Sequence, residues 1–279
     1  MGDLQLQTAV TPIGAADGDG TRRFGATVHR DWEIWGPEGG YVAAIALRAA
    51  GQCSPFARPA SFFCHYLAVA DFDEVELTVT PLRSGRTVLS QRVEMTQGGR
   101  TILSAMVWSV GQVDGLAHDD THPPEVPDPE GLPTPRQLWP DQEDQFNFWS
   151  NFDQRPIDYF ESWPPPGPVA PTWRTWVRCL PESSFDDPWV DAARTLIVLD
   201  VMSWPAGSRP HAYSEPPFIA PSLDLYASFL HPGRDSEWLL LSGHSPVAAD
   251  GLMSWTGQVW SRQRRLIASG GGQAVFRHT

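Results

Sequence analysis

Apolar and polar residues alternate along much of residues 58–110, as in strands that bury one face. The segments "VELTV" and "LSQRVEM" place an apolar side chain at nearly every second position. The run "QGGR" between two such segments is typical of a tight hairpin turn. We therefore expect an antiparallel sheet in this part of the chain, with strands at 60–69, 73–85, 86–99 and 100–110.

A different pattern precedes these strands. The segment "YVAAIALRAAG", residues 41–51, is rich in alanine and lacks alternation, which predicts a helix. We expect this helix to close at Gly51, because glycine suits a left-handed C-terminal cap. Alanine has little bulk, so the helix would be thin, and a curved sheet could wrap closely around it.

The second half of the chain repeats this order. The segment "DDPWVDAARTLIVLDVMSW", residues 186–204, predicts a helix with Asp187 as its N-cap and Pro188 in its first turn. Its apolar run indicates that it is largely buried. A strand is expected before it at 172–181. Four more are expected after it, at 220–230, 237–250, 251–262 and 265–277. Weak matches between the halves suggest a duplicated unit.

Prolines are concentrated between residues 123 and 171, in runs such as "THPPEVPDPEGLPTP" and "SWPPPGPVAP". Proline lacks a backbone donor and blocks helix interiors, so this region should mainly connect the two halves. The aromatic segment "DQFNFWSNFDQRPID" within it could form a strand. The predicted division is 1–115 for the N-terminal half, 116–170 for the connector and 171–279 for the C-terminal half.

Composition and charge narrow the classes of function. The net charge of −13 argues against nucleic-acid binding and against docking to anionic lipid, because both need clustered cations. The three cysteines form no CxxC pair, so neither a disulfide framework nor a metal site is expected. The chain starts without a signal-peptide pattern and has no apolar run of about 20 residues. We expect a cytoplasmic protein without a membrane segment.

Four segments, in this order of elements, resemble the type II (TesB-like) acyl-CoA thioesterases. They are "WGPEGGYVAAIALRAA", "RSGRTVLSQRVEMTQGGRTILSA", "PSLDLYASFLHP" and "RLIASGGGQAVFR". The resemblance spans roughly residues 22–112 and 172–277. It implies an α+β double hotdog, in which two antiparallel sheets each wrap around a long central helix and a Pro-rich connector joins them. It also implies hydrolysis of fatty acyl-CoA or a related acyl thioester by water without a cofactor or metal, in a homo-oligomer.

The resemblance also implies a catalytic set of an acid, a hydroxyl and an amide. A carboxylate can take a proton from water while the other two groups hold that water. Asp224 falls on the acid position. The hydroxyl position falls on Pro246 and the amide position on Gly272, so the neighbouring Ser245 and Gln273 are the candidates.

A shift of one residue turns a strand side chain to the opposite face. We hypothesise that a bulge in "SGGGQ" restores the direction of the Gln273 side chain.

Three residues at the start of the first helix complete the candidate site. The resemblance implies that Gly39, Gly40 and Tyr41 bind substrate. The backbone N–H groups of the two glycines would point at the thioester oxygen, because a helix N-terminus has unpaired donors and a positive partial charge.

Two other interpretations remain open from the sequence. Because Pro246 and Gly272 depart from the family pattern, the chain could be a non-catalytic acyl-CoA or lipid-binding module that kept the fold. A hotdog hydratase or dehydratase would need a histidine close to the acid, and none is paired with Asp224 in the sequence.

Overall fold

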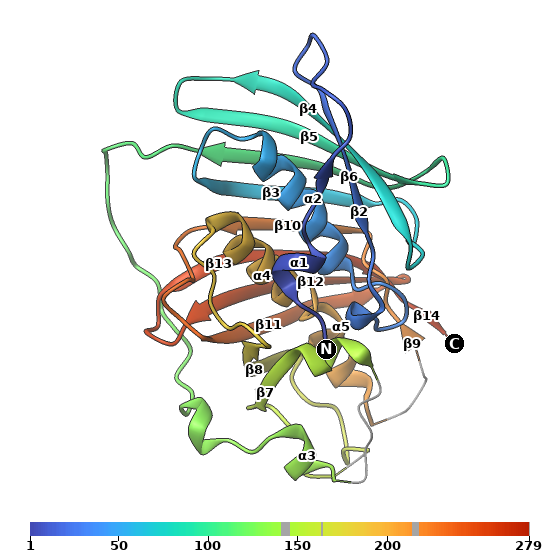
Figure 1. Cartoon of the computed structure of the whole chain (residues 1–279). Coiled ribbons are helices and arrows are strands. Elements are labelled where there is room, and N and C mark those ends of the chain that lie inside the picture. The colour runs from blue at the N-terminus through green and yellow to red at the C-terminus, as the bar shows by residue number, and fades with distance from the viewer. Residues whose placement is uncertain (141–145, 163, 214–217, 279) are drawn as a thin grey trace.

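The structure is a computed structural model that describes residues 1–140, 146–162, 164–213 and 218–278. It consists of one large curved sheet that wraps around two central helices, a small sheet of two strands, and shorter elements at the N-terminus and in the connector (Figure 1). The first half contains α1 (Leu4–Gln7), β1 (Thr11–Pro12), β2 (Arg22–Thr27), α2 (Gly39–Cys53), β3 (Arg58–Tyr66), β4 (Glu74–Ser84), β5 (Val88–Gln97) and β6 (Arg100–Val110). The connector contains α3 (Pro135–Leu138) and β7 (Phe152–Pro156). The second half contains β8 (Thr172–Cys179), α4 (Pro188–Asp200), α5 (Ser203–Ser208), β9 (Phe218–Ile219), β10 (Asp224–Phe229), β11 (Trp238–Ala249), β12 (Leu252–Ser261), β13 (Leu266–Val275) and β14 (Arg277–His278).

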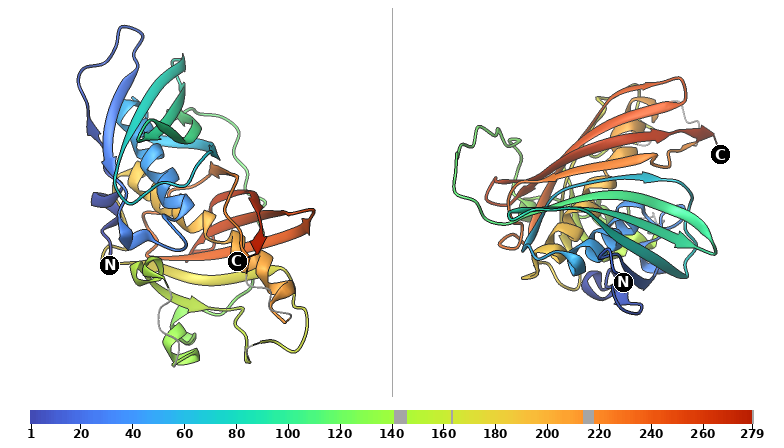
Figure 2. Two further views of the ribbon diagram at one scale, coloured as in Figure 1. Left: turned by 90° about the vertical axis from the view of Figure 1, so that its right-hand side faces the viewer. Right: turned by 90° about the horizontal axis from the view of Figure 1, so that it is seen from above.

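Twelve strands form one antiparallel sheet in the order β1-β2-β4-β5-β6-β3-β10-β13-β12-β11-β8-β7. The two halves meet where β3 pairs with β10, with Phe63 opposite Tyr226 and Cys64 opposite Leu225. Figure 2 shows the two parts of the sheet curving around the helices. The predicted double hotdog is confirmed, and the structure adds that its two sheets are joined edge to edge.

The predicted strands are present, and the hairpin in "QGGR" is confirmed. Gly98 and Gly99 both have positive φ angles, of 57° and 78°, as a tight hairpin turn requires. In the connector, Phe152–Pro156 of the aromatic segment forms β7, which extends the sheet by pairing with β8, and the first two residues of that segment, 144–145, lie outside the described residues.

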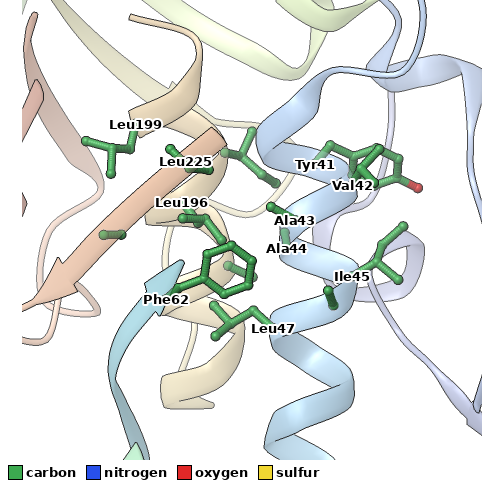
Figure 3. Close-up of a cluster of buried hydrophobic side chains, with 14 of the residues drawn as sticks. Tyr41, Val42, Ala43, Ala44, Ile45, Leu47, Phe62, Leu196, Leu199 and Leu225 are labelled. Carbon is green, nitrogen blue, oxygen red and sulfur yellow. The ribbon is translucent and has the colours of Figure 1, made fainter. Parts of the chain in front are cut away.

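Helices α2 and α4 run antiparallel in the middle of the molecule, with apolar side chains packed between and around them (Figure 3). At one end, a Cβ on Gly40 would lie 2.8 Å from the Cα of Ile197. At the other end, a Cβ on Gly51 would lie 2.7 Å from the ring of Trp189. The two glycines therefore let the helices approach more closely than larger residues would allow.

Two details of the predicted helices are wrong. Helix α2 does not close at Gly51 but continues to Cys53, because Gly51 serves the contact with Trp189 and not a left-handed cap. The predicted single helix of residues 186–204 ends at Asp200, and α5 follows a short turn. Pro205 has no N–H to donate to the preceding turn, so α4 cannot run through it. The predicted cap is confirmed, since Asp187 Oδ1 accepts the Trp189 N–H at 2.8 Å.

Within the described ranges, no helix is both long and apolar enough to cross a membrane. The same residues contain no group of three or more His, Cys, Asp or Glu side chains that could hold a metal ion.

Candidate active site

A large cavity opens where the N-terminus of α2 meets the C-terminus of α4. Its volume is about 1920 Å³, and Gly39 and Asp200 lie in its wall together with Tyr66 from the end of β3 and Ser222 from the segment before β10. Much of the remaining wall is aromatic. These side chains include Trp35, Trp149, Phe152, Trp173, Trp204 and Phe218. The cavity thus combines a polar end at the two helix termini with a mainly apolar interior.

Asp200 is the last residue of α4 and is 5% exposed. Its Oδ2 accepts the Gly40 N–H at 3.0 Å, and its Oδ1 accepts the Ser222 hydroxyl at 3.2 Å. A Cβ on Gly39 would lie 2.6 Å from Oδ2, so the absence of a side chain there makes room for the carboxylate. The unpaired donors and positive partial charge of the α2 N-terminus favour an anionic group at this place.

A second carboxyl group lies beside Asp200. Glu38 is the N-cap of α2, and its Oε2 accepts the Tyr41 N–H at 2.6 Å. Burial and the charge of Asp200 raise the pKa of Glu38 well above its usual value. Burial also raises the pKa of Asp200, although hydrogen bonds from Glu38, Ser222 and Gly40 oppose that shift. This arrangement favours a single shared proton, since a second buried negative charge in contact with the first is unfavourable.

The Tyr66 hydroxyl, at the end of β3, lies beside the group formed by Glu38 and Asp200. It is buried near Asp200 and next to the Cys64 thiol, and burial raises its pKa well above the usual range. Among the described residues it makes no hydrogen bond of ordinary geometry, although it interacts with Cys64. The hydroxyl stays neutral and faces the cavity wall next to Gly39.

Asp224 is placed outside this group. Its Oδ1 accepts the backbone N–H of Gln273 at 3.0 Å, between the neighbouring strands β10 and β13. A Cβ on Gly272 would lie 3.0 Å from the same oxygen, so this glycine leaves room for the carboxylate. Asp224 does not belong to the cavity wall, whereas Leu223 before it does.

The Gln273 side chain is exposed, and the hydrogen bond to Asp224 comes from the backbone N–H of Gln273. The hypothesis of a bulge in "SGGGQ" is wrong: the pairing of β13 with β12 is regular from Ala268 to Val275, and the register shifts at Val259 and Trp260. A Cβ on Gly270 would point at Leu199 of α4, so Gln273, three residues on, points away from the helices.

Ser245 lies far from Asp224. Strands β13 and β12 separate β11 from β10, which corresponds to about 14 Å at ordinary strand spacing. Its hydroxyl donates to the Ser254 carbonyl at 2.8 Å, at the irregular pairing of β11 with β12. The structure therefore does not bring Ser245 together with Asp224.

The predicted substrate-binding residues divide into two groups. Gly39 lies in the cavity wall, and the N–H of Gly40 is held by Asp200. Tyr41 is fully buried on the side of α2 that faces away from Leu196 and Leu199 (Figure 3). Its ring stacks on Trp32 with centroids 5.1 Å apart, and its hydroxyl donates to the Gln7 carbonyl at 2.9 Å.

Sequence reasoning missed Asp200, Ser222 and Glu38. One signal was available: Asp200 is a single charge directly after the apolar run "LIVL" in a helix predicted to be buried. A buried carboxylate needs a partner, so it marks a candidate site. Ser222 and Glu38 offered no comparable signal, because serine and glutamate are ordinary residues in loops and before helices.

The fold and this site define a double hotdog protein with a carboxylate-bearing cavity at a central helix terminus. The model of the acyl-CoA thioesterase N-terminal domain matches residues 28–110, and that of the acyl-CoA thioesterase C-terminal domain matches residues 121–275. The chain therefore belongs to the acyl-CoA thioesterase family and is an acyl-CoA thioester hydrolase.

Solved structures agree with this fold. The acyl-CoA thioesterase II TesB2 from Mycobacterium marinum is 21% identical, with 99% of each chain covered and a TM-score of 0.78. A tesB protein from Mycobacterium avium subs paratuberculosis is 20% identical, with 98% of each chain covered and a TM-score of 0.79. A putative thioesterase from Novosphingobium aromaticivorans is 23% identical over 91% of this chain and 94% of its own, with a TM-score of 0.73.

Proposed function

We propose that hydrolysis takes place at the polar end of the cavity and that Asp200 is the carboxylate that activates water. The observation that carries this proposal is the position of Asp200, which touches Gly40 at the α2 N-terminus and Ser222 in the cavity wall. No other carboxylate in the wall accepts a hydrogen bond from a helix N-terminus and from a hydroxyl group within the described residues.

The proposed reaction uses these groups in sequence. Water held by Asp200 and Ser222 attacks the carbonyl carbon of the thioester, and Asp200 takes one proton from it as the new C–O bond forms. The negative charge that develops on the carbonyl oxygen is stabilised by the Gly39 N–H at the positive end of α2. The C–S bond then breaks, and the leaving thiolate of coenzyme A takes up the proton from Asp200.

The apolar interior of the cavity is the proposed site for the acyl group. Its aromatic walls suit a hydrocarbon chain, and its volume of about 1920 Å³ exceeds the ~300–1,000 Å³ of common small-molecule pockets. We propose that the substrate is an acyl-CoA whose thioester lies at Asp200 and whose acyl group extends between the connector and α5.

The catalytic role of three residues remains a prediction from the family resemblance: Asp224, Ser245 and Gln273. The contact between Asp224 and Gln273 favours a role for this carboxylate in joining β10 to β13, next to the cavity and not within it.

Release of free thiol from acyl-CoA substrates of increasing chain length tests the proposal. Asp200→Asn should lower kcat by roughly 10²-fold or more, because the amide cannot accept the proton of water. Asp224→Asn is the matched comparison and should retain most of the rate. If Asp224→Asn removes the activity and Asp200→Asn does not, the water-activating carboxylate is Asp224 on β10 and not Asp200 on α4.

We also propose that the protein acts as a homo-oligomer in the cytoplasm. In support of an oligomer, large apolar side chains are exposed near the junction of the two halves, on the outer face of β3, β6 and β10. They are Phe63, Met106, Trp108 and Tyr226. Light scattering of the purified chain tests this, and a monomer at micromolar concentration contradicts it. Fractionation of the source cells tests the location.

A further inference from the structure

Glu38 is an unusual N-cap, and its second oxygen has no ordinary partner. Helix N-caps are mostly Ser, Thr, Asp or Asn, whose short side chains reach the N–H groups of the first turn. In Glu38, Oε2 does this for Tyr41, while Oε1 is buried without a hydrogen-bond donor among the described residues. A shorter side chain would cap α2 equally well, so capping does not account for a glutamate at this position.

The surroundings of Glu38 account for its length. Its carboxyl lies within hydrogen-bond reach of Asp200, and both residues are in the cavity wall while only 4% and 5% exposed. Glu38 Oε1 has no described donor, and the neighbouring Asp200 carboxylate can accept a hydrogen bond. One proton between the two groups satisfies both.

We propose that Glu38 is a positioning residue that holds a proton against Asp200 and thereby fixes the orientation of the water-activating carboxylate. This inference rests on the proposed role of Asp200. Because the pair keeps this proton, it carries a single negative charge. The Gly40 N–H and the Ser222 hydroxyl hold that charge in place.

Loss of this proton has a defined consequence. When Glu38 ionises, its negative charge repels that of Asp200 and pushes the Asp200 carboxylate away from the Gly40 N–H. We therefore expect activity to fall on the alkaline side of the pH–rate profile. The titratable groups that face Glu38 are Asp200 from α4 and Tyr66 from β3, with Cys64 behind Tyr66. Burial raises the pKa of Tyr66 and of Cys64 above their usual values, which already exceed that of a carboxyl group, so we expect both to stay neutral as Glu38 ionises. The alkaline limb of the pH–rate profile therefore belongs to the carboxyl pair.

Three variants of the protein test this inference, with kcat and KM for acyl-CoA hydrolysis measured from about pH 5 to about pH 9. Glu38→Gln keeps a donor toward Asp200 that does not ionise, so we expect kcat within about threefold of the wild type and no alkaline limb. Glu38→Ser keeps a helix cap but no donor that reaches Asp200, so kcat should fall roughly tenfold or more at an unchanged KM. Asp187→Asn is the matched control, because it replaces the N-cap carboxylate of the other central helix, and its profile should equal that of the wild type.

The outcomes separate this inference from the proposed function. If the wild type and both Glu38 variants share one pH profile, the inference is overturned while the hydrolytic site stands. If the wild type releases no thiol from any substrate, the proposed site fails. The proton can then still be detected, because the free energy of unfolding should decrease with rising pH and Glu38→Gln should reduce this decrease. If the wild type shows no such decrease, the inference is overturned. If Glu38→Ser does not fold, the profile of Glu38→Gln decides alone.

Discussion

The N-termini of the two central helices are equivalent in the duplicated fold but differ in the size of their first residues and in the groups that face them. Helix α2 begins with two glycines, and its N-terminus faces two buried carboxyl groups at the polar end of a large cavity. Helix α4 begins with Pro188 and Trp189, and the Trp189 ring packs against Gly51 while its Nε1 donates to the Phe56 carbonyl at 3.3 Å. One terminus is open to a ligand, and the other is filled by an aromatic side chain.

The charged groups near the two helix N-termini also differ. At α2 the negative charge of Asp200 lies directly on the Gly40 N–H. At α4 the cap is Asp187, and the nearby buried cation is Arg48 of α2, whose pKa is lowered by burial and raised again by the charge of Asp187. The helix N-terminus thus lies at the proposed catalytic site in one half and packs against an aromatic ring in the other. The size of the side chains at the first helical positions determines this difference.

The largest expected effect concerns the filled terminus. Trp189→Ala removes a ring that is 7% exposed and should lower the free energy of unfolding by about 3–5 kcal/mol, the usual cost of such a cavity. Urea unfolding measures this. Trp108→Ala is the control, because Trp108 is 37% exposed on the outer face of the sheet and should cost far less. Equal losses in the two variants would mean that Trp189 does not fill the α4 terminus.

Gly51→Ala should lower stability by about 1–3 kcal/mol, because the added Cβ meets the Trp189 ring at 2.7 Å. The same change in a Trp189→Ala background should stabilise the protein, since the clash is gone and alanine favours a helix more than glycine does. Additive effects of the two substitutions in a double-mutant cycle would contradict the proposed contact.

The open terminus should make stability depend on pH. The pKa of Glu38 is higher in the folded protein than in the unfolded chain, so the stabilisation is complete below the unfolded value near 4.5 and decreases as pH rises through the folded value. One proton corresponds to at most about 1.4 kcal/mol per pH unit. Urea unfolding at several pH values should show this slope in the wild type and a smaller one in Glu38→Gln. An identical slope in both would remove Glu38 from the carboxyl pair.

The smallest expected effect concerns the cap of α4. Asp187→Ala removes the acceptor of the Trp189 N–H and should lower the free energy of unfolding by about 1 kcal/mol. Asp187→Asn keeps an oxygen acceptor at the same position and should remain within a few tenths of a kcal/mol of the wild type. Neither variant should change the rate of thiol release, and a loss of rate would mean that the α4 terminus also takes part in catalysis.

Much of the fold was predictable because its signals are local. Alternation in "VELTV" follows from a strand that buries one face, and Asp187 before Pro188 follows from the chemistry of a helix start. The end of α2 was not predictable, because Gly51 has two possible uses and the choice depends on Trp189, which lies far along the chain.

The candidate site was predicted only in part, for the same reason. Gly39 and Gly40 were identified from the family resemblance, at the start of a predicted helix. The acid was placed on Asp224, whereas the structure places Asp200 in the cavity beside Gly40. Residues 40 and 200 are 160 positions apart and meet only because α2 and α4 pack antiparallel.

The sequence by itself determined the elements, their order and the family, since these depend on the periodicity of side chains and on residues close together in the chain. Only the tertiary structure decided which carboxylate faces the cavity, because that depends on the contact of two helices from different halves. It also decided that Glu38 faces Asp200 and that Trp189 fills the α4 terminus. The same duplicated unit therefore carries one open site and one closed one.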